Sequence, residues 1–109
     1  MRHDTHDLVS LDLAARIAAG LHRHPEWIEI ARSNLNRWMQ LNADAPGLLR
    51  CYEEWLELLK QPIEEICTAL TAASDEGQRL RQNSPFAGVL SPSEVWEIKR
   101  RRNHEATPA

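Results

Sequence analysis

Proline placement limits what this chain can fold into. Four of its six prolines, at positions 25, 46, 62 and 92, each stand at the start of a segment whose apolar residues recur at helical spacing. Proline suits the first turn of a helix, where its missing N–H has no partner anyway, but it interrupts a helix interior. No segment alternates apolar and polar residues as a strand does. The sequence therefore predicts several short helices.

The ends of these helices also carry signals. The clearest is Ser91-Pro92-Ser93-Glu94, in which Ser91 can cap a helix and Glu94 can bond back to the Ser91 N–H. Ser10 and Ser74 are expected to cap two further helices, of which the first carries the stripe Leu13, Ile17 and Leu21.

Five to six short helices with short connections predict an all-α bundle or array. A chain of 109 residues with 42% hydrophobic residues is long enough for one domain and too apolar to be disordered throughout. We expect that domain to span 10–104, between a flexible N-terminus at 1–9 and a flexible tail at 105–109.

Location follows from what the sequence lacks. The polar first residues do not resemble a signal peptide, and no apolar run is long enough to cross a bilayer, so we expect a cytoplasmic protein that does not enter membranes. Cys51 and Cys67 lie inside apolar patterns, and we expect both to be buried free thiols.

Charge is unevenly distributed along the chain. Its net value of −3 gives no general attraction to nucleic acid. Seven acids and one base lie between Glu53 and Glu76, whereas Lys99, Arg100, Arg101 and Arg102 form a basic run. Either run can be a solvated helix face, and either can contact a partner of opposite charge. The acids that we assign to partner binding are Glu53, Glu57 and Glu64, and the bases are Arg100, Arg101 and Arg102.

No motif for catalysis or cofactor binding is apparent. The four glycines are isolated, so there is no phosphate-binding loop, and neither cysteine stands at metal-ligand spacing from His22 or His24. Carboxylates on an amphipathic helix are typical of a solvated face. We therefore expect no catalytic residue, no cofactor and no metal, and a binding protein in place of an enzyme.

The apolar loop before the last helix has two interpretations. Pro85, Phe86, Val89 and Leu90 could cover the open end of the bundle. They could also form an arm with Trp96 that docks into a partner, because aromatic residues beside arginines are common in interface hot spots.

Two stretches are similar to a known group of proteins. Residues 75–92, followed by Trp96 and Ile98, and the pattern Arg32-x-x-Leu35-x-Arg37-Trp38 resemble small bacterial proteins of toxin–antitoxin modules, on the antitoxin side. The resemblance covers residues 25–98. It implies a cognate toxin as partner, in some modules one resembling a nucleotidyltransferase, and it implies no catalytic residues.

The function that we expect is therefore that of an antitoxin, which neutralises its toxin by direct protein–protein contact. The alternatives are a DNA-binding regulator that represses its own operon and an accessory subunit of a larger complex. DNA contact would need the basic run, from Lys99 to Arg102, on a DNA-facing helix. Exposed aromatic residues would also allow a homo-oligomer.

Overall fold

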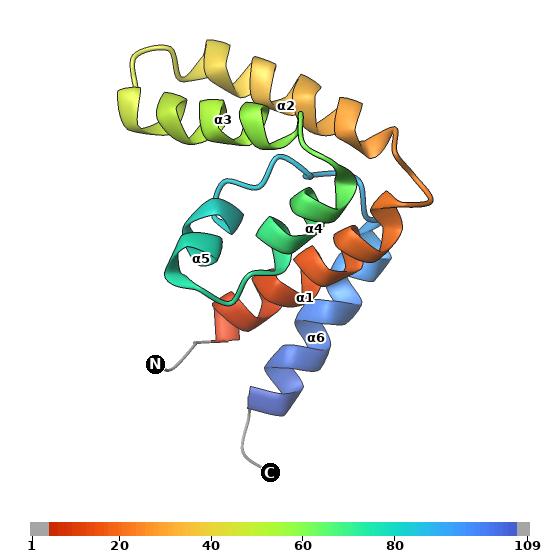
Figure 1. Ribbon diagram of the computed structural model, residues 1–109. Helices are drawn as coiled ribbons and strands as arrows, with labels where there is room; N and C mark the ends of the chain where they lie inside the picture. The colour runs from red at the N-terminus through yellow and green to blue at the C-terminus, as the bar shows by residue number, and fades with distance from the viewer. Residues whose placement is uncertain (1–4, 107–109) are drawn as a thin grey trace.

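The computed structural model describes residues 5–106, which form six helices and no strand (Figure 1). The all-α prediction is confirmed. The helices are α1 (Thr5–Leu21), α2 (Trp27–Leu41), α3 (Pro46–Leu58), α4 (Ile63–Thr71), α5 (Asp75–Arg81) and α6 (Pro92–Ala106).

The helices form two layers (Figure 1). α2 and α3 make an antiparallel hairpin that lies across one end of the molecule, and they pack mainly against each other. The second layer is centred on α1, which contacts α4, α5 and α6. Within the described residues α6 meets chiefly α1, so most of its circumference faces away from the core.

Most helix starts follow the predicted signals. Pro46 and Pro92 are the first residues of α3 and α6, and α4 begins directly after Pro62. Ser74 caps α5, because its Oγ accepts a hydrogen bond from Gly77 N at 3.1 Å. The capping box is also present.

In the capping box, Glu94 N donates to Ser91 Oγ at 3.2 Å and Ser91 N donates to Glu94 Oε1 at 3.4 Å.

The start of α1 was predicted wrongly. The helix begins at Thr5, so Ser10 is inside it, and the part of the predicted flexible N-terminus at 5–9 is helical. Val9 extends the stripe of Leu13 by one turn and is buried, which explains the longer helix.

The other ends differ less. α2 starts at Trp27, two residues after Pro25, and α6 runs through 105–106 of the predicted tail. Residues 1–4 and 107–109, the rest of the two segments predicted to be flexible, lie outside the described residues.

The core lies where the hairpin meets the second layer. Trp55 of α3 is fully buried at this junction. Its indole Nε1 donates to Leu80 O at 3.0 Å, and its ring meets the Phe86 ring edge-on with centroids 6.2 Å apart. This pair ties α3 to α5 and to the loop before α6. The buried core cluster comprises Ala14, Ile17, Leu21, Ala31, Leu35, Tyr52, Trp55, Leu59, Ile66, Leu70 and Phe86.

Candidate functional site

The loop 84–90 is part of the interior. Phe86 is only 2% exposed and Pro85 is fully buried. From α2, the buried Asn34 Nδ2 donates to Pro85 O at 2.9 Å and to Ala87 O at 3.1 Å. The interpretation of Pro85 and Phe86 as a partner-binding arm is wrong, because their surfaces are covered by the chain's own core.

The other two apolar residues of that interpretation also face inward. Val89 and Leu90 are half-buried and pack against the core cluster. The loop therefore closes the junction between the layers, which is the covering role that the sequence left open.

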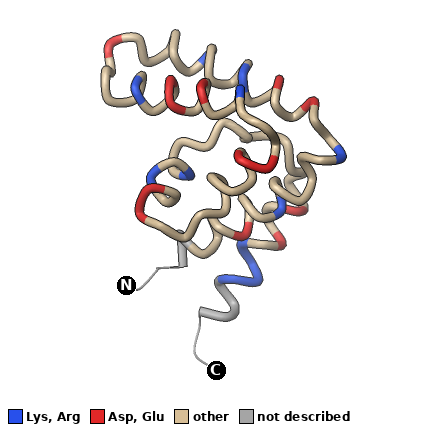
Figure 2. Tube along the Cα trace, viewed as in Figure 1, with Lys and Arg blue, Asp and Glu red and all other residues tan. Residues whose placement is uncertain are grey.

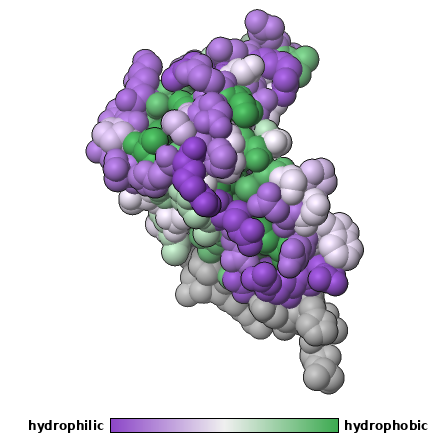
Figure 3. Space-filling view, turned by 90° about the vertical axis from the view of Figure 1, so that its right-hand side faces the viewer, coloured by the Kyte–Doolittle hydropathy of each residue, from purple (hydrophilic) through white to green (hydrophobic). Residues whose placement is uncertain are grey.

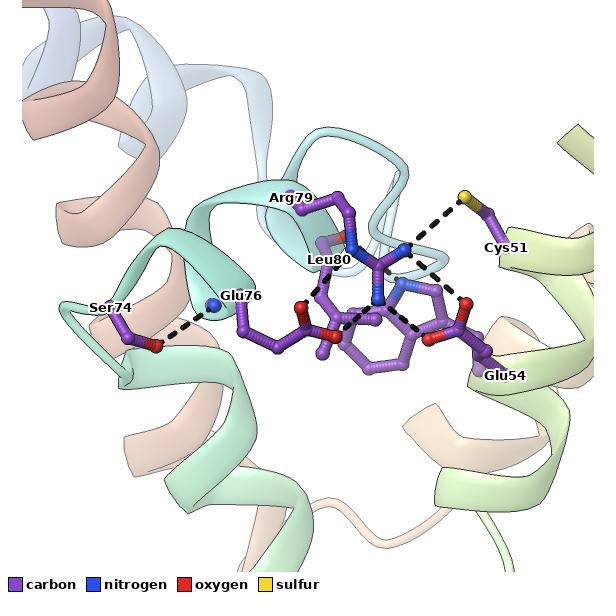
Figure 4. Close-up of polar contacts among 8 residues, drawn as sticks. Cys51, Glu54, Ser74, Glu76, Arg79 and Leu80 are labelled. Atoms are coloured by element: carbon purple, nitrogen blue, oxygen red, sulfur yellow. Dashed lines mark hydrogen bonds and ion pairs between the residues drawn. The ribbon is translucent and has the colours of Figure 1, made fainter. Parts of the chain in front are cut away.

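Three acids of the acidic stretch, Glu54, Glu57 and Glu76, form ion pairs within the molecule. Arg79 of α5 pairs with Glu54 of α3, with Nη2 at 2.7 Å from Oε2, and with Glu76 one turn before it (Figure 4). These contacts lower the pKa of the Glu76 carboxyl and raise that of the Arg79 guanidinium. Glu57 pairs with Lys60 at 3.0 Å. Part of this stretch, which the sequence left open between a solvated face and a partner-binding patch, is therefore used in local ion pairs.

Two of the acids assigned to partner binding remain without such pairs. Glu53 and Glu64 are exposed, and neither forms an ion pair with another residue in the described part of the chain. Glu53 and Glu57 line an open groove of about 530 Å³ that has Leu58 and Leu80 among its apolar residues. The groove is therefore lined by both charged and apolar side chains.

α6 is fixed to α1 along one side. Ile98 is 3% exposed and packs inward. One turn later Arg102 forms a two-pronged pair with Asp12 of α1, with Nε at 2.6 Å from Oδ2 and Nη2 at 3.0 Å from Oδ1. This hydrogen bond lowers the pKa of the Asp12 carboxyl, although partial desolvation opposes it. Arg102 was predicted to contact a partner; in the structure its guanidinium holds α6 against α1, and its contact with a partner stays a prediction.

The opposite side of α6 is exposed. Trp96 has 62% of its surface exposed, and the guanidinium carbon of Arg100 lies 5.2 Å from the centre of its ring. This stacking joins a cation to an aromatic face at a spacing of four residues. Lys99 and Arg101 of the same helix are also exposed, and Arg101 lies near enough to Asp12 to lower the pKa of that carboxyl. Figure 2 shows these bases as one blue run along α6. We call Trp96, Lys99, Arg100 and Arg101 the outer face of α6.

The other large exposed apolar residues, Ile30 and Leu41, lie on α2. Leu41, at the end of α2, is 73% exposed, and Ile30 of the same helix is 40% exposed. In Figure 3, apolar atoms appear in patches between hydrophilic ones, and the surface is indented between the upper and lower parts. The outer face of α6 is distinguished from the α2 residues by the cation that stacks on its aromatic ring.

Metal-ligating and nucleophilic side chains are scattered. Among the residues that the structure describes, no three His, Cys, Asp or Glu side chains lie close enough to hold a metal ion. The His24 ring stacks on Trp27 with centroids 4.9 Å apart. Cys51 and Cys67 are free and half-buried, which is less buried than predicted. The pKa of the Cys67 thiol is raised, mainly by burial and secondly by the negative charge of the nearby Glu64.

Sequence reasoning missed three side chains that position these surfaces, namely Asn34, Arg79 and Asp12. Their partners Pro85, Glu54 and Arg102 are 51, 25 and 90 residues away in the chain. No local pattern identifies such pairs.

No protein-family model, curated protein or solved structure matches this chain. Within residues 5–106, none of the helices combines the length and the apolar character needed to cross a membrane.

Proposed function

We propose that this chain is a non-catalytic protein-binding domain, that the outer face of α6 is its binding surface, and that its partner is a cognate toxin neutralised by direct contact. The observation that carries the proposal is Trp96, a large aromatic side chain left 62% exposed on a helix whose other side is firmly packed. Exposed tryptophans flanked by arginine are typical of binding hot spots.

The charges around Trp96 define the kind of surface that fits. Arg100 stacks on its ring, Lys99 is three residues away on the helix, and Arg101 is exposed farther round it, so the complementary surface on the partner is acidic with an apolar pocket. Because Ile98 and the Arg102–Asp12 pair fix the inner side of α6, little ordering is needed on binding.

The identity of the partner as a toxin is supported by the resemblance of residues 75–92 and of the Arg32 to Trp38 pattern to antitoxins. Most of these residues lie in α5, in the loop 84–90 and in α2. Their resemblance to antitoxins therefore concerns the fold more than the outer face of α6, where we propose the partner binds. Glu53 and Glu64, on α3 and α4, provide a second and weaker contact for a toxin with a basic cleft.

Co-expression with the product of the neighbouring gene, followed by affinity capture, tests the proposal. We expect capture by the unmodified chain, and a loss of about tenfold or more in affinity for Trp96→Ala. Leu41→Ala is the matched control, because Leu41 is even more exposed but lies at the end of α2. Equal losses in both variants would place the contact elsewhere. A monomer that leaves the neighbour's toxicity unchanged would overturn the assignment as an antitoxin.

DNA binding is a second candidate, favoured by the same three exposed bases of α6. If they contact phosphates, binding to the upstream region of the operon must weaken with salt, and each base removed must lower the salt slope by about one. A gel shift at two salt concentrations measures this. Binding that does not depend on Lys99, Arg100 or Arg101 would exclude this role for α6.

A further inference from the structure

A pocket of about 190 Å³ lies between α1, the loop 84–90 and the start of α6. Its walls are mostly apolar and come from all three segments. The apolar wall residues include Leu13, Ile17, Phe86, Leu90 and Val95.

Two features keep the loop from filling this space. Asn34 of α2 holds the carbonyls of Pro85 and Ala87 through buried or part-buried hydrogen bonds, so the loop is anchored on the side facing the hairpin. Close by, Gly88 has a φ of 88°, a conformation that residues other than glycine rarely adopt. Collapse of the loop into the pocket would break both arrangements.

The pocket is partly open to solvent, so an apolar ligand that entered it would remove water from its apolar wall, which is favourable. A dry apolar cavity of about 150 Å³ is large enough to bind benzene. Small-molecule sites in proteins are commonly concave, apolar and provided with a few polar groups.

We propose that this pocket is a binding site for a small, uncharged, chiefly apolar molecule, between benzene and indole in size, with one hydroxyl or N–H group. The site is independent of the outer face of α6, and the proposal does not rest on the proposed function.

The charges around the pocket favour a neutral ligand. Among the residues that line it, the charged one is Arg81, whose Nη1 donates to Leu70 O at 3.2 Å and to Ala72 O at 2.5 Å, at the end of α4. Its guanidinium is thus already engaged with the protein. A cationic ligand would find no carboxylate among the lining residues, and burying an unpaired charge is costly.

Two serine hydroxyls of the protein can form hydrogen bonds with the polar group of the ligand. Ser10 of α1 and Ser84 of the loop both line the pocket. Ser84 Oγ accepts from Phe86 N at 3.4 Å, which leaves its O–H able to donate to a ligand oxygen and its second lone pair able to accept from a ligand O–H or N–H. A ligand hydroxyl or N–H can therefore be satisfied without exposing it to water.

The experiment is a titration of the full chain, followed by two-dimensional amide and methyl NMR, with four probes: indole, benzyl alcohol, benzoate and benzylammonium. We expect saturable shifts with indole and benzyl alcohol, with a Kd between about 1 μM and 1 mM. Contacts from the bound probe to the methyl groups of Leu13, Ile17 and Val95 would locate it in the pocket. These contacts are measured on the unmodified chain.

Three variants, one of them a control, sharpen the result. Val95→Phe narrows the pocket and should weaken benzyl alcohol binding about tenfold or more, while Ser93→Phe, an exposed position on the same helix outside the lining, should leave it unchanged. Ser10→Ala should weaken benzyl alcohol by about threefold to tenfold, the effect of one lost hydrogen bond.

Several outcomes would overturn the proposal. They are no saturable shift with either neutral probe, contacts to methyl groups outside the pocket, or benzoate or benzylammonium binding as tightly as benzyl alcohol. If Val95→Phe does not fold, the contacts observed in the unmodified chain decide the result.

Discussion

The loop 84–90 and the outer face of α6 are neighbours in the sequence, and both are built around an aromatic residue, yet they have opposite roles. Phe86 is 2% exposed and meets Trp55 edge-on, whereas Trp96 is 62% exposed and meets only the guanidinium of Arg100 among the ring and cation contacts found within residues 5–106. A buried polar side chain, Asn34, holds the loop from another helix. The comparison teaches that an aromatic residue in an irregular segment can be structural, while one on a regular helix can face solvent.

The largest effect should come from removing the buried ring. Phe86→Ala removes the contact with Trp55 and leaves a cavity at the junction of the two layers, so we expect a loss of about 3–5 kcal/mol in the free energy of unfolding. Urea denaturation measures it. Phe86→Leu, which keeps an apolar side chain, should cost clearly less. A loss below about 1 kcal/mol for Phe86→Ala would mean that the loop is not part of the core.

The next effect should come from the anchor of the loop. Asn34→Ala leaves the carbonyls of Pro85 and Ala87 without their donor, and we expect a loss of about 1–3 kcal/mol in unfolding free energy. The matched control is Asn36→Ala, an exposed position on α2, which should change stability by less than about 0.5 kcal/mol. Equal effects of the two substitutions would contradict the anchoring role.

A smaller effect, dependent on pH, should come from the inner side of α6. The folded pKa of Asp12 is lowered by Arg102, so the pair stabilises the fold above the unfolded pKa of about 3.9 and this contribution is lost as pH falls through the folded pKa. Asp12→Asn should therefore cost about 1 kcal/mol at neutral pH, a modest figure because the side chain is 29% exposed and partly screened, and the cost should shrink as pH falls through the folded pKa.

The exposed pair Glu29–Arg32 is the control for Asp12. Glu29→Gln should leave the unfolding free energy nearly unchanged over the same pH range. An Asp12→Asn difference that stays constant as pH falls would contradict the assigned ion pair.

The smallest effect on stability should come from the outer face of α6. Trp96→Ala should change the unfolding free energy by less than about 0.5 kcal/mol, because the ring packs little against the core. Thermal unfolding followed by circular dichroism measures it. A loss as large as that of Phe86→Ala would show that Trp96 is a core residue and remove it from the proposed binding surface.

The fold was largely predictable, because its signals are local. Pro46, Pro92 and the caps at Ser74 and Ser91 determine helix starts through the missing N–H of proline and through side-chain hydrogen bonds to nearby backbone, and all are found where the sequence placed them. The start of α1 was missed because Ser10 is a plausible cap, although Val9 already continued the apolar stripe.

The candidate site was only partly predictable. Trp96, Arg100 and Arg101 are on the surface as expected, since a charged run at a helix end is solvated on at least one side. The roles of Phe86 and Arg102 depend on Trp55 and Asp12, which are distant in the chain, and the pairing of Glu54 with Arg79 depends on how α3 and α5 meet. Such contacts follow from packing and not from local pattern.

Amide hydrogen exchange of the chain, with and without the co-expressed neighbour bound, tests the central claim most directly. The account predicts added protection around Trp96 to Arg101 on α6 and unchanged exchange in the loop 84–90. Protection that appears in the loop, with α6 unchanged, would contradict the assignment of the outer face of α6 as the binding surface.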